Sequence, residues 1–456
     1  MKRLFGTDGI RGRLCDGLDP FLAFKVGYAS ADVLSEGANG GRVLIACDTR
    51  LSSSSLTYAL ASGVCMAGCD AYVCGVLPTP ALAYLVEAEN FLYGVMVSAS
   101  HNGAEYNGIK LISSDGTKLA DDVEEIIEEK IFAFDAEKSE CKKDFAVGSV
   151  REHMSAAEKY IRHLKKCYDD ECRGHSDLAK LKIGIDCANG AVSHIAAGIF
   201  TDLGHDVVFI NREPDGKNIN LGCGSTDTAA LSALVVERGL DLGVAFDGDG
   251  DRCLAVDSCG RLVDGDEIIA VMLEDAVRTE KLTNACAVGT VMSNRGLAER
   301  CEELGVRFIA AAVGDRYVKE EMDKSGAFIG GEPSGHIVFG NICSTGDGPL
   351  TALMLIALIS RRRTPLAELC LAFHRVPSFE RNIEIDPSRR DEFKADREMD
   401  VLREKAYEEL GAGASLVLRA SGTEPCIRIR IEYRDVCKAE NVMEWLCERI
   451  SDKYGI

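Results

Sequence analysis

The sequence predicts an α/β fold in which three similar units are followed by a smaller α+β unit. The chain has 456 residues, which is too long for one hydrophobic core and suggests about three domains. Along most of its length, strand-like apolar runs alternate with helical stretches, as is typical of βαβ units and parallel sheets. The last stretch differs, because apolar and polar residues alternate there with a period of two.

The first unit is predicted from Arg42 onward. Strands alternate with helices there, and the expected elements are 42–47, 55–68, 70–76, 80–89 and 91–97. A later helix would place four apolar side chains on one face: Val123, Ile126, Ile127 and Ile131. The stretch 133–155 is charged and weakly patterned, so we expect a domain boundary near it.

The same alternation returns twice, so that three units of about a hundred residues form a weak internal repeat. The expected elements of the second unit are 181–186, 194–203, 205–211, 228–238 and 242–246. The third unit begins with a helix near Asp266, and its expected strands are 285–291, 306–313 and 327–332. The last unit is expected to combine a helix at 391–410 with antiparallel strands at 415–420 and 426–433.

Composition and charge exclude several classes of partner. The hydrophobic fraction of 46% and the charged fraction of 27% are those of an ordinary soluble globular protein. A net charge of −21 argues against nucleic acid, which requires clustered Lys and Arg. A small anionic substrate would need a local basic pocket in this acidic chain.

Neither membrane insertion nor secretion is expected. No segment approaches the ~18 apolar residues that span a bilayer. The N-terminal stretch reaches Asp8 before an apolar signal region can form. The 19 cysteines form no Cys-x-x-Cys pair, so we expect most of them to be reduced core residues of a cytoplasmic protein.

The stretch FDGDGDRC at 246–253 is the strongest candidate for a metal site. Asp247, Asp249 and Asp251 follow a predicted strand directly. Three carboxylates this close repel one another unless a cation offsets them, and such hard oxygen ligands suit Mg²⁺. A calcium-binding EF-hand is excluded because Arg252 stands where that motif has glycine. A solvated acidic turn is the alternative.

The stretch RASGTEPCIR at 419–428 offers ligands for a phosphate group. Its candidate residues supply two guanidinium groups, two hydroxyls and accessible backbone N–H groups: Arg419, Ser421, Gly422, Thr423 and Arg428. A hairpin turn with two incidental arginines is the alternative. A basic cluster in an acidic chain favours the phosphate site.

The stretch GGEPSGHI at 330–337 places Glu332, Ser334 and His336 between glycines after another predicted strand. A carboxylate and a hydroxyl on a tight loop suit hydrogen bonding to sugar hydroxyls. Gly-Pro-Ser strings are also common turns, and a lone histidine is as often structural as functional.

The stretch VMVSASHNGAEYNGIK at 95–110 contains a candidate nucleophile, Ser100. This serine follows a predicted strand end, where ligands of open α/β sheets usually bind. It has neither a Gly-x-Ser-x-Gly elbow nor an identifiable Asp partner, so serine-hydrolase chemistry is not expected. A turn residue is the simplest alternative. A serine that carries a phosphoryl group beside Mg²⁺ would use all four loops, with Arg11, His101 and Lys110 as nearby cations.

Together these motifs resemble those of the α-D-phosphohexomutases, in the same order and across the whole chain. The matching stretches are FGTDGIRG (5–12), SASHN with NGIK (98–102, 107–110), DGDGDR (247–252), GEPSGH (331–336) and RASGTEP (419–425). Within this superfamily, the chain is most similar to the bacterial phosphoglucosamine mutases. The stretches that carry this similarity are DCANGA (186–191), NINLGCGST (218–226), TVMSN (290–294) and VGDRYV (313–318). Two residues depart from the pattern: Gly103 replaces a usual proline, and Pro333 replaces a usual glutamine.

The resemblance implies four domains around a central cleft, the first three of one mixed α/β type. The expected domains are a phosphoserine domain at 1–150, a metal-binding domain at 151–255, a sugar-binding domain at 256–368 and a phosphate-binding domain at 369–456. Ser100 would be the phosphorylated serine, and the three aspartates would hold Mg²⁺ together with its phosphate. The sugar would contact Glu332, Ser334 and His336, and the phosphate that does not react would be held by the 419–428 cluster. The reacting end would be lined by Arg11, His101, Lys110 and Arg252, with Lys110 as the general base.

The implied reaction is the interconversion of glucosamine 6-phosphate and glucosamine 1-phosphate, which feeds amino-sugar nucleotide and cell-wall precursor synthesis. It would pass through a hexosamine 1,6-bisphosphate, which also serves as an activator. Phosphoglucomutase or phosphomannomutase activity, a Mg²⁺-dependent phosphatase and a non-catalytic sugar-phosphate binder remain open. The expected partner is a small sugar phosphate, with a homodimer left open as the assembly.

Overall fold

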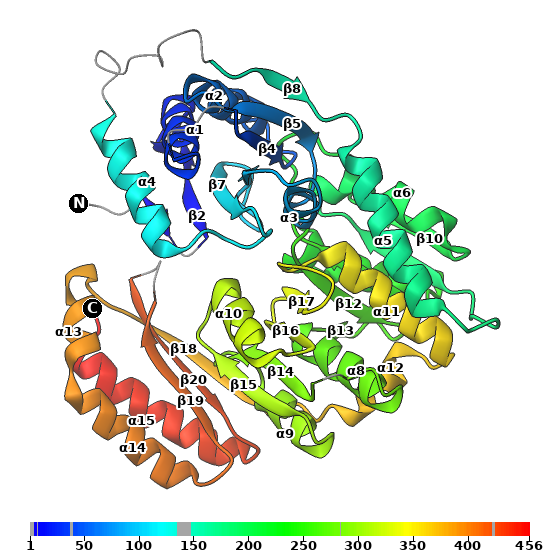
Figure 1. Cartoon of the computed structure of the whole chain (residues 1–456). Helices are drawn as coiled ribbons and strands as arrows, with labels where there is room; N and C mark the ends of the chain where they lie inside the picture. The colour runs from blue at the N-terminus through cyan, green and yellow to red at the C-terminus, as the bar shows by residue number, and fades with distance from the viewer. Residues whose placement is uncertain (1–3, 7, 37–39, 135–146, 283, 422–424) are drawn as a thin grey trace.

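The computed structural model describes residues 4–6, 8–36, 40–134, 147–282, 284–421 and 425–456 (Figure 1). These residues form four sheets, which follow one another along the chain as four α/β or α+β domains. The predicted fold class, three similar mixed α/β units before a smaller α+β unit, is confirmed.

The first domain is built on an eight-stranded mixed sheet with the order β1-β2-β7-β6-β4-β5-β8, and β3 pairs with β2. Its elements are β1 (Phe5–Gly6), β2 (Gly9–Leu14), β3 (Gly17–Leu18), α1 (Pro20–Leu34), β4 (Arg42–Cys47), α2 (Ser53–Met66), β5 (Asp70–Val76), α3 (Thr79–Ala88), β6 (Tyr93–Val97), β7 (Tyr106–Ser113), α4 (Asp121–Ala133) and β8 (Val150–Glu152). Of the four apolar residues expected on one face of α4, Ile127 and Ile131 are buried, whereas Ile126 is exposed.

The second domain has a sheet with the order β10-β9-β11-β12-β13. Its elements are α5 (Ala156–Cys172), β9 (Lys182–Asp186), η1 (Ala191–His194), α6 (Ala196–Phe200), η2 (Thr201–Leu203), β10 (Asp206–Ile210), η3 (Gly224–Thr226), α7 (Ala229–Arg238), β11 (Leu242–Phe246), β12 (Cys253–Asp257) and β13 (Leu262–Val263). The helix expected at 194–203 is broken into the short α6 between two 3₁₀ turns. Gly204 in the left-handed conformation ends this segment.

The third domain has a sheet with the order β15-β14-β16-β17. Its elements are α8 (Gly265–Arg278), β14 (Cys286–Thr290), α9 (Arg295–Glu303), β15 (Arg307–Ala311), α10 (Asp315–Ser325), β16 (Ile329–Gly331), β17 (Ile337–Phe339), α11 (Gly348–Arg362), α12 (Leu366–Leu369) and η4 (Cys370–Ala372). The apolar helix α11 is buried almost throughout and lies against α5 of the second domain (Figure 1). No helix among the described residues is both long and apolar enough to cross a membrane.

The fourth domain is a three-stranded antiparallel sheet, β18-β20-β19, covered by helices. Its elements are β18 (Ser378–Glu384), η5 (Pro387–Arg389), α13 (Arg390–Ala395), α14 (Arg397–Leu410), β19 (Ser415–Ala420), β20 (Cys426–Glu432) and α15 (Val436–Tyr454). This domain has a hydrophobic core of its own, whereas one large core runs through parts of the first three domains.

One departure from a purely parallel sheet recurs in each of the first three domains. The hairpins β6–β7, β11–β12 and β16–β17 each reverse the chain, so the second strand of each pair runs antiparallel to the first. The reversing loops are 98–105, 247–252 and 332–336, which contain the serine, aspartate and sugar motifs. The internal repeat therefore places three chemical motifs at one equivalent position of three domains.

Candidate active site

The serine loop and the aspartate loop meet in the interior. Ser100 Oγ donates a hydrogen bond to Asp247 Oδ2 at 2.6 Å, and both residues are buried. One carboxylate oxygen from each of Asp247, Asp249 and Asp251 lies within 4.8 Å of the others. The structure thus brings the predicted nucleophile into direct contact with the predicted metal ligands.

The three aspartates have the chemistry of a cation site. Burial and the charges of Asp251 and Asp249 raise the pKa of Asp247 well above its usual value. In addition, Asp249 Oδ1 and Asp251 Oδ1 are buried and have no hydrogen-bond partner among the described residues. Unpaired buried carboxylate oxygens are costly, and a hard divalent cation would pair with them. These residues therefore fit Mg²⁺.

Lys110 provides the positive charge nearest to these aspartates. Its ammonium lies 2.8 Å from Asp249 Oδ2, 3.1 Å from Asp8 Oδ2 and 3.7 Å from Asp251 Oδ2, and it is almost fully buried. Burial by itself disfavours the ammonium, but Asp249, Asp8 and Asp251 raise the pKa of Lys110 well above its usual value. Lys110 is therefore charged in this structure.

Ser100 has a left-handed backbone with φ of 51°, which a non-glycine residue rarely adopts. Arg50 holds this loop by donating to the carbonyl oxygens of Ser100 at 3.0 Å and Asn102 at 2.9 Å. Asn220 of the second domain donates to the same two oxygens at 2.9 and 3.0 Å. The strained turn is thus stabilised from two domains.

Sequence reasoning missed several residues that build this site. Arg50 follows a strand end and is paired with buried Asp48 at 2.7 Å, while Asn220 lies within a quoted family stretch. Asp8, also in a quoted motif, contacts Lys110. Thr79, at the start of α3, donates to Asp249 Oδ2 at 2.7 Å, and no local signal marks it. Arg50 could have been found from its position after a strand end, and Asn220 and Asp8 from their place within the quoted motifs.

A cleft of about 390 Å³ opens beside the serine and is lined by the first three domains. Its charged and imidazole side chains are Asp8, Arg11, His101, Asp251, Arg252, Asp315, Glu332 and His336. Burial and the nearby Arg252 and Arg11 lower the pKa of His101 to about 4, so its imidazole is neutral near pH 7. Arg11 and Arg252 therefore supply the positive charge on this part of the wall.

The predicted sugar loop forms the third-domain wall of the cleft. Glu332 Oε1 accepts a hydrogen bond from Gly314 N at 3.2 Å, and Ser334 Oγ lies 3.4 Å from Glu332 Oε2. His336 is buried and accepts a hydrogen bond from Gly346 N at its Nε2. Glu332 and His336 both line the cleft.

The predicted phosphate cluster lies on the fourth domain, and its described residues do not line the 390 Å³ cleft. Gly422 and Thr423 lie outside the described residues. Arg419 on β19 is directly opposite Arg428 on β20, so both side chains project from the same face of the hairpin. Two cations placed in this way repel each other unless an anion offsets them, which suits a phosphate.

Four family models match the chain in order. They describe phosphoglucomutase/phosphomannomutase, with alpha/beta/alpha domain I at residues 2–138, domain II at 158–260, domain III at 264–376 and the C-terminal domain at 382–448. The chain therefore belongs to the phosphoglucomutase/phosphomannomutase family, as the resemblance of its motifs implied.

Within this family the chain is similar to phosphoglucosamine mutases along its whole length. That of Thermoanaerobacter pseudethanolicus is 41% identical over 455 residues, covering 99% of this chain and 100% of the relative. That of Clostridium botulinum strain Alaska E43 is 40% identical over 453 residues, with the same coverage.

Solved structures share the fold. A phosphoglucomutase/phosphomannomutase family protein from Burkholderia thailandensis has a TM-score of 0.81 at 23% identity, covering 98% of this chain and 97% of its own. The Aspergillus fumigatus N-acetylphosphoglucosamine mutase, solved in complex with GlcNAc-6P and magnesium, has a TM-score of 0.70 at 17% identity, with 98% and 95% covered.

Proposed function

We propose that this chain is an isomerase that interconverts glucosamine 6-phosphate and glucosamine 1-phosphate. The observation that carries the proposal is the 2.6 Å hydrogen bond from Ser100 to Asp247 within a buried group of three aspartates. The similarity to phosphoglucosamine mutases at about 40% identity supports the amino sugar as substrate. The product would feed amino-sugar nucleotide and cell-wall precursor synthesis in the cytoplasm.

In the proposed reaction, phosphorylated Ser100 gives its phosphoryl group to the C1 hydroxyl of glucosamine 6-phosphate. The bond from phosphorus to Ser100 Oγ breaks as the bond to O1 forms, and a base accepts the hydroxyl proton. The resulting 1,6-bisphosphate turns end for end and returns its 6-phosphate to Ser100. The same bisphosphate, supplied in trace, would rephosphorylate an empty serine and so act as activator.

Other residues of the cleft would bind the metal, line the reacting end and accept the proton. Asp247, Asp249 and Asp251 would hold Mg²⁺, which offsets the charge of the transferring group when bound. Arg11, His101 and Arg252 would line the reacting end, and Lys110 is the proposed proton acceptor. Because three carboxylates keep Lys110 protonated here, this role requires those contacts to change.

The other end of the substrate would be held by two groups of residues. Glu332 and Ser334 would bind sugar hydroxyls, with His336 supporting the loop. The phosphate that does not react would be bound by Arg419, Ser421, Gly422, Thr423 and Arg428. Each of the four domains would then have one task. The phosphoserine would lie in 1–150, the metal site in 151–255, the sugar site in 256–368 and the phosphate site in 369–456. A homodimer remains the proposed assembly.

Activity on glucose or mannose phosphates is a second candidate, because Pro333 replaces a glutamine usual in glucosamine mutases. Proline removes an N–H and fixes φ, so a polar contact to the sugar is lost there. Comparing kcat/KM for the 1-phosphates of glucosamine, glucose and mannose, each with trace bisphosphate, decides between them.

The serine itself provides the direct test. Intact mass should show one phosphoryl group on the wild-type protein that phosphatase removes. Ser100→Ala should lose this group and at least about 1,000-fold of kcat, while sugar-phosphate binding persists. Ser114→Ala is the matched variant, since Ser114 is an exposed serine of the same domain and its loss should leave phosphorylation of Ser100 unchanged. Full turnover by Ser100→Ala would refute the phosphoserine mechanism.

A further inference from the structure

A ring of six charged or imidazole side chains, three of them buried and three partly exposed, joins the first three domains beside the cleft. The charged ring runs in the order Asp251, Lys110, Asp8, Lys118, Asp315 and His336, and closes on Asp251. His336 lies between Asp251 and Asp315: its Nδ1 is 3.7 Å from Asp251, and its Nε2, which accepts the Gly346 N–H, is 3.8 Å from Asp315. Lys110, Asp8 and Lys118 belong to the first domain, Asp315 and His336 to the third, and Asp251 to the second.

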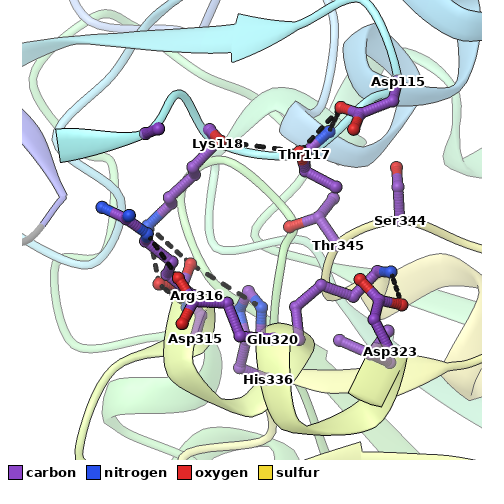
Figure 2. Close-up of a pocket in the computed structure, with 13 residues that line it drawn as sticks. Asp115, Thr117, Lys118, Asp315, Arg316, Glu320, Asp323, His336, Ser344 and Thr345 are labelled. Atoms are coloured by element: carbon purple, nitrogen blue, oxygen red, sulfur yellow. Dashed lines mark hydrogen bonds and ion pairs between the residues drawn. The ribbon is translucent and has the colours of Figure 1, made fainter. Parts of the chain in front are cut away.

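Lys118 is the member that crosses between domains without touching the candidate metal ligands. Its ammonium contacts Asp8 in the first domain and lies 2.6 Å from Asp315 Oδ2 at the start of α10 in the third domain. Figure 2 shows Lys118 and Asp315 facing each other at one end of a second cavity, with His336 beside them. That cavity measures about 190 Å³ and lies between the same two domains.

One ammonium therefore neutralises two carboxylates that belong to different domains. Although burial opposes the charge, Asp315 and Asp8 raise the pKa of Lys118, so this ammonium remains charged. Both carboxylates lie within contact of the same nitrogen atom, so they would repel each other across the domain boundary without it. Removing this ammonium leaves Asp315 without its lysine partner in a partly buried group, which weakens the contact between the two domains.

Both ends of this bridge lead directly to the cleft. Asp8 also contacts Arg11 and Lys110, which belong to the proposed reacting end. Asp315 follows Gly314, whose N–H is bound by Glu332 on the proposed sugar wall. The distance between the two walls therefore depends on the contacts of Lys118.

We propose that Lys118 is a positioning residue that sets the width of the cleft between the first and third domains. By binding Asp8 and Asp315 at once, it holds the reacting end and the sugar wall in register. This inference rests on the proposed mutase function for its kinetic consequence, but its structural consequence is independent of it.

A double variant of Lys118 and Asp315 distinguishes a loss of positioning from general damage to the protein. If Lys118 acts by positioning, the second substitution should restore activity and not lower it further. Lys118→Met should lower kcat/KM by about 30-fold or more, mainly through kcat, because Asp315 loses its ammonium partner and the bridge to Asp8 is cut. Lys118→Met with Asp315→Asn should recover at least about fivefold of that loss, because the repulsion is removed. Lys118→Arg, which can keep both contacts, should stay within about threefold of wild type.

Lys319→Met is the matched control. Lys319 lines the same 190 Å³ cavity but pairs only within α10, with Asp323, among the described residues. Its loss should change kcat/KM by less than about twofold. A drop as large as that of Lys118→Met would attribute the effect to the cavity surface and overturn the proposal.

Amide hydrogen exchange provides a readout that does not require turnover. Exchange in the segments 8–12 and 313–318 should accelerate about tenfold in Lys118→Met and slow again in the double variant. Asp315→Ala, which cuts the bridge at the other end, should accelerate the same segments if Lys118→Met does not fold. Unchanged exchange in these variants, or a double variant as impaired as Lys118→Met, would refute the bridge. A wild-type protein without mutase activity would instead refute the proposed function.

Discussion

Ser100 owes its geometry to residues that lie far from it in the sequence. Its left-handed backbone is held by Arg50 and Asn220, which donate to the carbonyl oxygens on either side of the turn. Ser98, an apparently ordinary turn residue, is buried and accepts a hydrogen bond from Ser100 N at 2.9 Å. The proposed nucleophile therefore lies on a preformed loop.

Gly103 stands where the family resemblance leads us to expect proline, and glycine restricts the backbone less than proline does. Arg50 contacts the carbonyl oxygen of Gly103 and donates to that of Tyr106 at 3.0 Å. The loop is thus held by a buried guanidinium group in place of a proline ring.

Asn220→Ala should slow turnover because it removes the hold of the second domain on the serine loop. We expect kcat to fall by about tenfold, with slower phosphorylation of Ser100 and little change in KM. Steady-state kinetics and a time course of intact mass measure both effects. Asn218→Ala is the control, because its side chain binds only its own loop among the described residues. Equal rates in both variants would contradict the role of Asn220.

At the scale of elements, strands were easier to predict than their directions. The apolar runs around 42–47, 91–97 and 242–246 are strands, as expected. The antiparallel return strands of the three hairpins were not expected, because a short apolar run looks the same whichever way its neighbour runs. Those returns matter, since they place the three motif loops at equivalent strand ends.

The pair of helices α5 and α11 contains a buried acid that no proposed chemical step uses. Asp347 caps α11 by accepting a hydrogen bond from Leu350 N at 2.8 Å, and Tyr160 of α5 donates to both of its carboxylate oxygens. Burial raises the pKa of Asp347 from 3.8 to about 7. The folded protein thus keeps a proton on Asp347 that the unfolded chain releases above about pH 4.

The raised pKa of Asp347 predicts that the stability of the protein depends on pH. Because the folded state binds the extra proton, the free energy of unfolding should fall as pH rises from about 4 to 7. Asp347→Asn should reduce that fall by on the order of 2 kcal/mol, measured by thermal or urea unfolding across this range. Asp435→Asn, an exposed cap of α15, should leave the pH dependence as it is. Parallel curves for wild type and Asp347→Asn would refute the assignment.

At the scale of the whole molecule, the fourth domain is attached through a few buried polar contacts. Asn294 exchanges hydrogen bonds with the backbone of Val376, just before β18, and donates to Glu432 Oε1 at 3.0 Å. Glu432 of the fourth domain also accepts from Arg295 N at 2.8 Å. The stretch TVMSN, which had no chemical assignment, therefore contributes the junction between domains.

Asn294→Ala should loosen this junction and misplace the proposed phosphate cluster. We expect KM for the sugar phosphate to rise by about tenfold, while Ser100 is still phosphorylated because its own domains are intact. Kinetics and intact mass together separate the two effects. Asn284→Ala is the control in the same domain, since the side chain of Asn284 hydrogen-bonds only to the Ser325 carbonyl oxygen among the described residues. An unchanged KM would show that Asn294 does not position the fourth domain.

The sequence by itself determined the α/β class, the order of the motifs and the chemical type of each loop. These depend on residues a few positions apart, such as carboxylates that alternate with glycines or hydroxyls between arginines. Only the tertiary structure decided which residues surround Ser100 and how the domains are joined. Arg50, Asn220 and the bridge from Lys118 to Asp315, 197 residues along the chain, make their contacts only once separate sheets have packed. Local spacing carries no information about such distant contacts, because they depend on the packing of whole domains.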